Sequence, residues 1–352
     1  MNPSTHPFRQ LLRHRLGFIS LILLVIIYIV AILAPFLSPY DVSTLDLKKT
    51  YHPPTRLLWK DSRIHVQIYE NINPTSATYA PAQGKTTPLH FFVQSGTPYR
   101  LLGLFPCQTR LFSVDKEERI YLLGSDSTGR DVFSRLLMGS RISLTIGLVG
   151  VAITMGLGII IGGLSGYFGG FLDDISMRVT ELLMAIPGLY LLLALRATLA
   201  QHFSSDQIFF LIVVILSFIG WSGTARVVRG LVLSLRQRPF ILAAESMGQT
   251  PWKILWKHLF PNIFSYLIIA ATLSVPSYIL NESALSFLNI GIQDPDTSWG
   301  LMLKDAQDMK VFMLGFWWLL LPGGAIFVTV IAFNLLGDAL RDIVDPKFRM
   351  TN

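Results

Sequence analysis

The stretch Gly17–Phe36, GFISLILLVIIYIVAILAPF, contains no charged residue and decides the class of this protein. An α-helix rises 1.5 Å per residue, so about 20 apolar residues cross the hydrocarbon core of a bilayer. The run is longer than the apolar core of a cleavable signal peptide, and Pro35, Leu37 and Pro39 at its end do not form a cleavage site of small residues. We therefore expect a membrane-spanning helix that the mature chain retains.

Five further apolar runs follow along the chain. They are Ile142–Leu164, Val179–Leu199, Ile208–Gly223, Phe264–Leu288 and Phe312–Leu335. The runs are continuously apolar rather than alternating, which favours helices over membrane strands. The composition agrees, since 51% of the 352 residues are hydrophobic and only 14% are charged, against about 25% charged in soluble domains. The sequence predicts an all-α integral membrane protein with six transmembrane helices.

Positive charge is distributed unevenly between the connections. It gathers before the first span, between the fourth and fifth spans and after the sixth: Arg9, Arg13, Arg15, Arg226, Arg229, Arg236, Arg238, Lys253, Lys257, Arg341, Lys347 and Arg349. The short connection Gln201–Gln207 has no Lys or Arg. Because cytoplasmic connections carry the excess of Lys and Arg, the pattern predicts both termini in the cytoplasm. It also explains the net charge of +7, so we expect a lipid bilayer and no nucleic acid as partner.

The connection Ser38–Leu122 between the first two spans is long and rich in proline. Its stretch Arg63–Tyr69 alternates in the way typical of a strand. A connection of this length without secondary structure is unusual. We therefore expect a β-containing extracytoplasmic insertion. The chain then has three parts: residues 1–37, the cytoplasmic N-terminus and first helix; residues 38–122, the insertion; and residues 123–352, a core with five helices.

The cytoplasmic connection Arg236–Asn262 carries signals for two short helices. Pro239 suits the first position of one helix, and Gly248 supplies a left-handed stop after it. A second, amphipathic helix follows, and Pro261 is expected to break it just before the fifth span. Such an amphipathic helix either lies on lipid headgroups or docks onto a cytoplasmic protein, and its chemistry favours neither interpretation.

The same connection resembles the hallmark loop of ABC importer permease subunits, in which Glu-Ala-Ala is followed by glycine and proline at fixed distances. The matching positions are Leu242, Ala243, Ala244, Gly248 and Pro261, with leucine in place of the glutamate. The resemblance implies that the two alanines sit against an ATPase subunit. It also implies that the glycine sets the bend of the loop and that the proline sets the angle into the fifth span.

Four further stretches resemble the second permease of dipeptide and oligopeptide importers. They are Leu123–Leu144, Gly166–Asp173, Asn281–Leu288 with Ser298–Gly300, and Phe333–Asp342 with Asp345 and Pro346. Together they cover most of residues 123–349, whereas the insertion is not covered. The resemblance implies the importer permease fold in a bacterial inner membrane and an alternating-access pathway for peptides, with half of that pathway formed by this chain.

The resemblance also implies several partners. They are a second, homologous permease, two cytoplasmic ATP-binding subunits and an extracytoplasmic solute-binding protein. ATP and Mg²⁺ would be held by the ATPase subunits, and no cofactor is expected in this chain. The transported solute stays open between dipeptides, longer peptides, nickel complexes and peptide antibiotics.

The residues themselves offer little for catalysis, nucleotide binding or metal binding. Gly124–Gly129 has the glycine spacing of a phosphate-binding loop, but Arg130 and Asp131 follow where Lys and Ser or Thr are needed. The seven histidines show no metal-binding spacing, and Cys107 is the single cysteine. Asp173 and Asp174 suit structural pairing or an ATPase contact better than acid–base chemistry. We therefore assign no catalytic residue and no metal site, and we expect the chain not to be an enzyme.

Three polar residues are candidates for the pathway or its gating. Glu282 lies in an apolar run, and it either lines the pathway or pairs with a neighbour at the helix end. Asn334 and Asp338 lie four residues apart near the inner end of the last span, in a tail that resembles the family's.

Two other classes of function stay open. A stand-alone channel or secondary transporter predicts charged residues deep in several spans, and the sequence has few. A membrane-anchored protein acting through its insertion predicts a nucleophile–base pair or metal spacing there, and neither is evident in the sequence.

Overall fold

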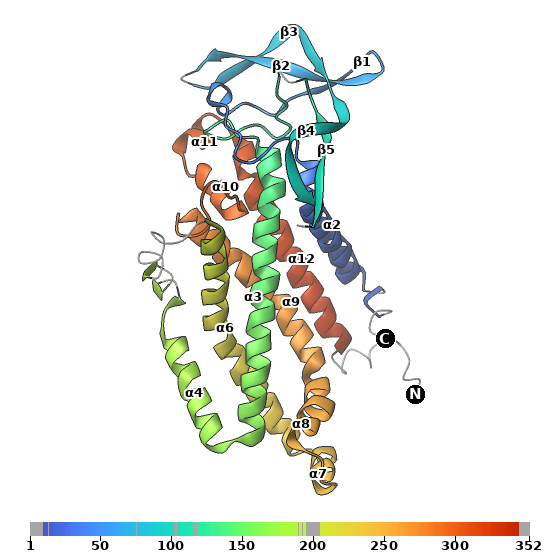
Figure 1. The fold of residues 1–352 in the computed structure, drawn as a ribbon, viewed down its shortest axis with the longest axis vertical. Helices are drawn as coiled ribbons and strands as arrows, with labels where there is room; N and C mark the ends of the chain where they lie inside the picture. Colours follow the sequence, from blue (N-terminus) through green and yellow to red (C-terminus); the bar gives the residue numbers. More distant parts are fainter. Residues whose placement is uncertain are drawn as a thin grey trace. The chain divides into compact units, whose positions relative to one another are not determined.

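The computed structural model describes residues 10–12, 14–74, 76–101, 104–115, 118–188, 190–191, 193–194 and 205–344. In this part of the chain, five helices are long and apolar enough to cross a membrane. They are Arg15–Leu37, Val132–Phe168, Phe210–Arg236, Pro251–Phe287 and Trp317–Val344. The mostly helical fold with a β-containing insertion after the first span agrees with the prediction (Figure 1).

The remaining expected span, Val179–Leu199, lies partly outside the described residues. Helix α4 begins earlier, at Gly170, and ends at Ala185. Ile186 is extended because the residue before a proline disfavours the helical conformation, and Pro187 follows. Helical hydrogen bonding resumes where Tyr190 and Leu191 donate to the Pro187 carbonyl. The expected span is therefore interrupted at this proline, and its residues 195–199 lie outside the described residues.

The chain divides into two compact units. The first comprises Met1–Leu23, Ile146–Ile279 and Val330–Asn352, and the second comprises Leu24–Thr145 and Leu280–Thr329. These units are defined by contacts within the chain. The expected boundaries at residues 37 and 122 are defined by where the chain leaves and re-enters the membrane, so the two divisions are not comparable.

Helix α3 (Val132–Phe168) runs through both units, and its part in the first unit packs closely on helix α6 (Ser205–Arg236). Gly158, Gly162 and Gly166 lie four residues apart on α3 and face α6. A Cβ at Gly166 would lie 2.9 Å from the Arg229 carbonyl oxygen. Small residues thus let the backbones of the two helices approach closely, as is typical of membrane helices. Helix α4 lies along the same α6 (Figure 1).

In the second unit, the insertion forms two antiparallel sheets. Strands β1 (Leu57–Lys60), β2 (Arg63–Asn73) and β3 (Thr78–Pro88) form a meander, and β4 (His90–Leu101) pairs with β5 (Phe105–Ser113). Asp61 and Ser62 join β1 to β2 with φ of 50° and 60°, the left-handed pair that suits a two-residue hairpin. The strand expected at Arg63–Tyr69 is the first part of β2.

The last apolar run, Phe312–Leu335, is divided in the structure. Helix α11 (Met309–Met313) ends before Gly315, whose φ of +74° turns the chain. A single 3₁₀ turn, Trp317–Leu320, then leads into helix α12 (Leu321–Val344). Helix α10 (Trp299–Asp305), α11 and this turn bury Met302, Val311 and Trp318 against Val132 at the start of α3.

Candidate functional site

The loop that resembles an importer coupling loop follows α6. Helix α7 (Pro239–Ser246) begins at Pro239, and Gly248 has φ of +74°, so both predicted features are confirmed. A Cβ at Gly248 would meet no other atom within 4 Å. The requirement for glycine therefore comes from the left-handed backbone and not from lack of space.

The second predicted helix does not break at Pro261. Helix α8 (Pro251–Ile254) continues through a π-helical turn, Leu255–Leu259, into helix α9 (Phe260–Phe287). In this turn the Phe260 N–H donates to the carbonyl of Leu255, five residues earlier. Proline has no N–H, and its ring collides with the carbonyl four residues before it. The wider turn accommodates these two effects, so Pro261 reshapes the helix without ending it.

The two alanines of the loop lie in different environments. Ala243 is exposed, whereas Ala244 is only 1% exposed and packs in a core of this chain. The core also contains Tyr167, Val228, Val232, Ile241, Ile254, Leu255 and Leu259. Ala244 therefore cannot face a partner in this structure, and the expectation that both alanines do is corrected. Helical spacing places Ala244 on the face of Ile241, which is turned inward.

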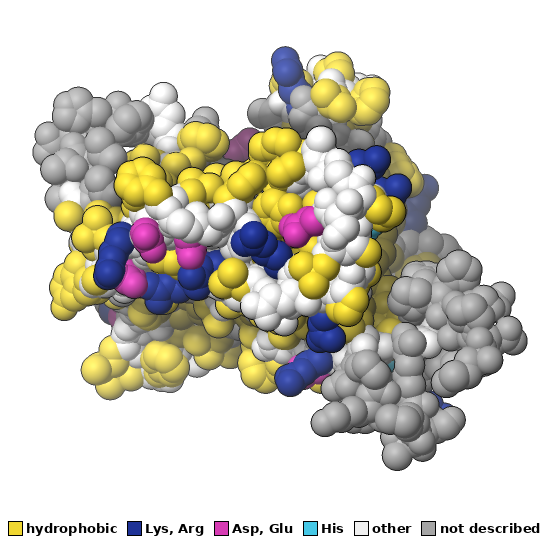
Figure 2. Space-filling view, turned by 90° about the horizontal axis from the view of Figure 1, so that it is seen from below, with side chains coloured by type: hydrophobic (Ala, Val, Ile, Leu, Met, Phe, Trp, Pro, Cys, Tyr) yellow, Lys and Arg dark blue, Asp and Glu magenta, His cyan; other side chains and the backbone are white. Residues whose placement is uncertain are grey.

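The outward face of the loop is largely apolar. Leu242 is 50% exposed, and four larger side chains are also exposed: Phe240, Met247, Trp252 and Trp256. Figure 2 looks onto the end where Figure 1 labels α7 and α8, and it shows hydrophobic side chains interspersed with basic and acidic ones. Several large apolar side chains exposed together on a short amphipathic element are typical of a docking face.

Polar contacts hold the loop to its neighbours. The Tyr167 hydroxyl donates to Oε1 of Glu245 at 3.1 Å, and the guanidinium of Arg236 lies over the Tyr167 ring at 5.4 Å. Nearby, Arg229 of α6 donates two hydrogen bonds to Asp173 of α4. Of the two adjacent acids singled out in the sequence, Asp173 thus makes a structural ion pair.

Glu282 is fully buried in the second unit, within a set of serines. Its carboxylate accepts hydrogen bonds from the hydroxyls of Ser143 at 3.1 Å, Ser286 at 2.6 Å and Ser283 at 3.5 Å. The Ser143 oxygen also accepts the N–H of Trp299 at 3.1 Å. Because its side chain is enclosed by other residues of this chain, Glu282 does not line a pathway in this structure. Of the two expected roles, the structure supports the one in which Glu282 is bonded to neighbouring side chains.

The surroundings of Glu282 bring together three stretches that the sequence presents far apart. Gly139 of α3 abuts Ser298, since a Cβ there would lie 3.2 Å from the Ser298 carbonyl carbon. A Cβ at Gly300 would lie 2.5 Å from Cα of Ser283. The glycines therefore permit the backbone approach on which the serine contacts depend.

The other two pathway candidates belong to a different compact unit from Glu282. Asn334 and Asp338 belong to the first unit, where both are exposed on α12 one turn apart. A polar pair exposed on a membrane helix is costly in hydrocarbon, so this face is suited to water or to another protein.

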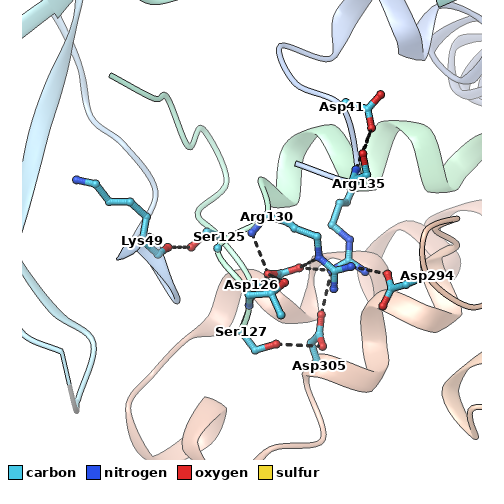
Figure 3. Close-up of polar contacts among 12 residues, drawn as sticks. Asp41, Lys49, Ser125, Asp126, Ser127, Arg130, Arg135, Asp294 and Asp305 are labelled. Carbon is cyan, nitrogen blue, oxygen red and sulfur yellow. Dashed lines mark hydrogen bonds and ion pairs between the residues drawn. The ribbon is translucent and has the colours of Figure 1, made fainter. Parts of the chain in front are cut away.

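An aspartate–arginine cluster around the start of α3 was not predicted from the sequence (Figure 3). It consists of Asp126, Arg130, Arg135, Asp294 and Asp305. Arg135 pairs with both Asp126 and Asp305, the latter at 3.0 Å, while Arg130 pairs with Asp126 at 2.7 Å and with Asp294. The alternating acids and arginines between Asp126 and Arg135 were a sequence signal for ion pairing. Their partners Asp294 and Asp305 lie more than 150 positions away, and one sequence alone does not show such distant pairs.

Burial and charge act in opposite directions on the acids of this cluster. Burial favours the neutral form of Asp126, but Arg135 and Arg130 outweigh it and lower its pKa. Burial raises the pKa of Asp305, although Arg135 opposes that effect. The central acid is therefore held ionised between the two arginines.

The same segment contains the glycine-spaced loop Gly124–Gly129. Both glycines have positive φ, of 78° and 76°. The Asp126 carboxylate accepts the backbone N–H groups of Thr128 at 2.8 Å and Arg130 at 3.0 Å. A carboxylate of the chain thus occupies the N–H groups that a phosphate would need, in agreement with the rejection of a nucleotide site here.

Comparison with known proteins assigns the family. The model of binding-protein-dependent transport system inner membrane components matches residues 158–350, more than half of the chain. The model of the N-terminal transmembrane domain of oligopeptide transport permease C matches residues 7–54.

Individual relatives agree with these matches. The dipeptide transport system permease protein DppC of Bacillus subtilis is 32% identical over 343 residues, covering 97% of this chain and 85% of the relative. The oligopeptide transport system permease protein OppC of the same organism is 30% identical over 336 residues, covering 96% and 87%. The glutathione transport system permease protein GsiD of Pectobacterium atrosepticum is 40% identical over 227 residues, covering 64% and 73%. With its membrane helices and its loop after α6, the chain belongs to the family of binding-protein-dependent transport system inner membrane components.

Proposed function

We propose that this chain is one of two permeases in an ATP-driven importer of peptides and forms half of its pathway. The names of its relatives support the solute class, because they refer to dipeptides, oligopeptides and glutathione. The partners in this proposal are a second permease, two ATP-binding subunits that hold ATP and Mg²⁺, and a solute-binding protein.

The observation that carries the coupling role is the two-sided structure of the loop. Its outward face exposes Leu242, Ala243 and Met247, whereas its inward face is locked into a core with α6 and α9. A partner bound to the outward face therefore moves helices α6 and α9 when it moves. Ala244 acts in this proposal as the packing residue, and Gly248 and Pro261 shape the element.

We further propose that both termini and this loop face the cytoplasm and that the insertion lies on the other side. The supporting observation is the excess of Lys and Arg near the loop and the chain ends. The insertion is then on the side from which a solute-binding protein delivers its ligand.

The test is a mild-detergent purification of the tagged complex with Met247→Asp and with Trp59→Asp. Met247 is 71% exposed directly after α7, and Trp59 is 76% exposed on β1 in the other unit. A charge placed in an apolar docking face opposes binding, so we expect Met247→Asp to reduce the co-purified ATPase subunits and peptide uptake at equal expression. Trp59→Asp is the control and should retain both. Full ATPase recovery and uptake with Met247→Asp would overturn the coupling role.

A further inference from the structure

The short helix α7 depends on contacts with the rest of the chain for its position. It has only eight residues, and a helix in water is marginally stable by itself below about 12–15 residues. Two of its side chains, Ile241 and Ala244, are fully buried in the core of the loop. Apolar contacts are non-directional, so they hold α7 against the core more strongly than they fix its rotation.

One polar contact between α7 and α3 is directional. The hydroxyl of Tyr167, in the last turn of α3, donates to Oε1 of Glu245, in the last turn of α7, at 3.1 Å. Among the described residues, no other side chain of α7 donates or accepts a hydrogen bond with another helix. Glu245 is also the single acidic residue of the connection Arg236–Asn262. Because a hydrogen bond depends on angle as well as distance, this contact selects the face of α7 that is turned to the core.

Tyr167 is itself held in one orientation. It is only 6% exposed, and the guanidinium of Arg236, in the last turn of α6, lies over its ring at 5.4 Å. The ring of Phe168 is T-shaped to it at 5.3 Å. Burial and these two ring contacts leave the hydroxyl few alternative directions. The last turns of α3, α6 and α7 thus meet at one tyrosine.

We propose that Tyr167 is a positioning residue of the loop, because its hydroxyl holds Glu245 and thereby sets the rotation of α7. The inference rests on the proposed coupling role and names the residue that orients the docking face. Successive helical residues are about 100° apart, so rotating α7 by one residue turns Leu242 toward the core and Ala244 outward. Without the hydroxyl, α7 stays on the core but rotates more freely, and part of a bound partner's motion is not passed on to the long helices.

The position of α7 can be measured without any partner subunit. Tyr167→Phe removes the hydroxyl and keeps the ring, and the matched control is Tyr266→Phe on α9, whose hydroxyl makes no hydrogen bond within the described residues. In a Cys107→Ser background, which has no other cysteine, nitroxide labels at Met247→Cys after α7 and Phe171→Cys on α4 lie at highly exposed positions of the full chain in detergent. We expect the distribution of distances between the labels to broaden in Tyr167→Phe and to match the wild type in Tyr266→Phe.

The consequence for coupling is measured in the transporter assembled in proteoliposomes. We expect Tyr167→Phe to retain the co-purified ATPase subunits but to take up severalfold less peptide for each ATP hydrolysed. Glu245→Ala should act in the same way, and the double variant should be no worse than either single one, because both changes remove one contact. Glu245→Gln keeps an oxygen that accepts the hydroxyl and should restore most of the ratio.

Two results would overturn the proposal. Equal distance distributions in Tyr167→Phe and the wild type would show that the apolar core alone orients α7. A further loss of ATPase subunits when Glu245→Ala is added to Tyr167→Phe would show that Glu245 contacts the partner directly. A wild-type chain that neither binds an ATPase nor takes up peptide would instead refute the proposed function, while the distances in detergent still report whether Tyr167 orients α7.

Discussion

Arg135 is a buried cation between Asp126 and Asp305 in the aspartate–arginine cluster. Arg135→Ala would remove the shared partner of two buried acids, and breaking a buried ion pair in this way costs about 3–5 kcal/mol. We expect a large fall in the unfolding temperature of the detergent-solubilised chain. The control is Arg178→Ala, because Arg178 pairs with Glu181 on the exposed surface of α4, where a pair contributes little. Equal unfolding temperatures for the two variants would contradict a structural role of the cluster.

Asp131, just before α3, gives a prediction of pH dependence at the same scale. Burial raises the pKa of Asp131 to about 7, although its side chain accepts the Ser134 N–H at 2.8 Å. The folded state thus binds this proton more tightly than the unfolded state does. The stability that this group contributes is complete below its ordinary pKa of 3.8 and is lost as the pH rises through about 7.

The variant Asp131→Asn isolates this contribution, because asparagine also caps helices but does not ionise. We expect the unfolding temperature of the wild type to fall more than that of the variant between pH 5 and pH 8. Other acids change both proteins equally, so the difference between the two curves is the measured quantity. Parallel curves would show that Asp131 does not titrate in this range.

At the scale of elements, the packing of α3 on α6 depends on glycine positions. A Cβ at Gly162 would lie within 3.0 Å of Cα of Ala225, whereas a Cβ at Gly156 on the same helix would meet nothing within 4 Å. Gly162→Ala should therefore separate the helices and destabilise the chain by about 1–3 kcal/mol, the usual cost of overpacking. Gly156→Ala is the matched control, and we expect its unfolding temperature in detergent to equal or exceed that of the wild type. A tolerated Gly162→Ala would argue against this packing.

At the scale of the whole molecule, the orientation in the membrane follows from charge and can be measured. In the Cys107→Ser background, Trp59→Cys lies in the insertion and Met247→Cys in the loop after α7, both at highly exposed positions. We expect a membrane-impermeant maleimide to label Trp59→Cys in intact cells. Labelling of Met247→Cys should require permeabilised membranes. The reverse pattern would invert the proposed topology.

Much of the element structure was predictable because it depends on local properties of the chain. Apolar runs of membrane length predicted the spans, proline and glycine predicted the start of α7 and the turn at Gly248, and alternation predicted part of β2. Pro187 and Pro261 show the limit of that reasoning. Both prolines lack an N–H, yet α4 ends before Pro187, whereas the helix continues past Pro261 through a π-helical turn. The difference lies in tertiary packing, because the buried side chains of Leu255 and Leu259 hold that turn in place.

By itself, the sequence determined the membrane class, the position of the insertion and the loop that identifies the family, since each depends on residues close together in the chain. Only the tertiary structure decided which loop residues face outward, that serines enclose Glu282, and that Arg135 joins Asp126 to Asp305. The reason is physical: the burial and ionisation of a side chain depend on groups that folding brings near it. Ser143 is 139 positions from Glu282, and Asp305 is 170 positions from Arg135.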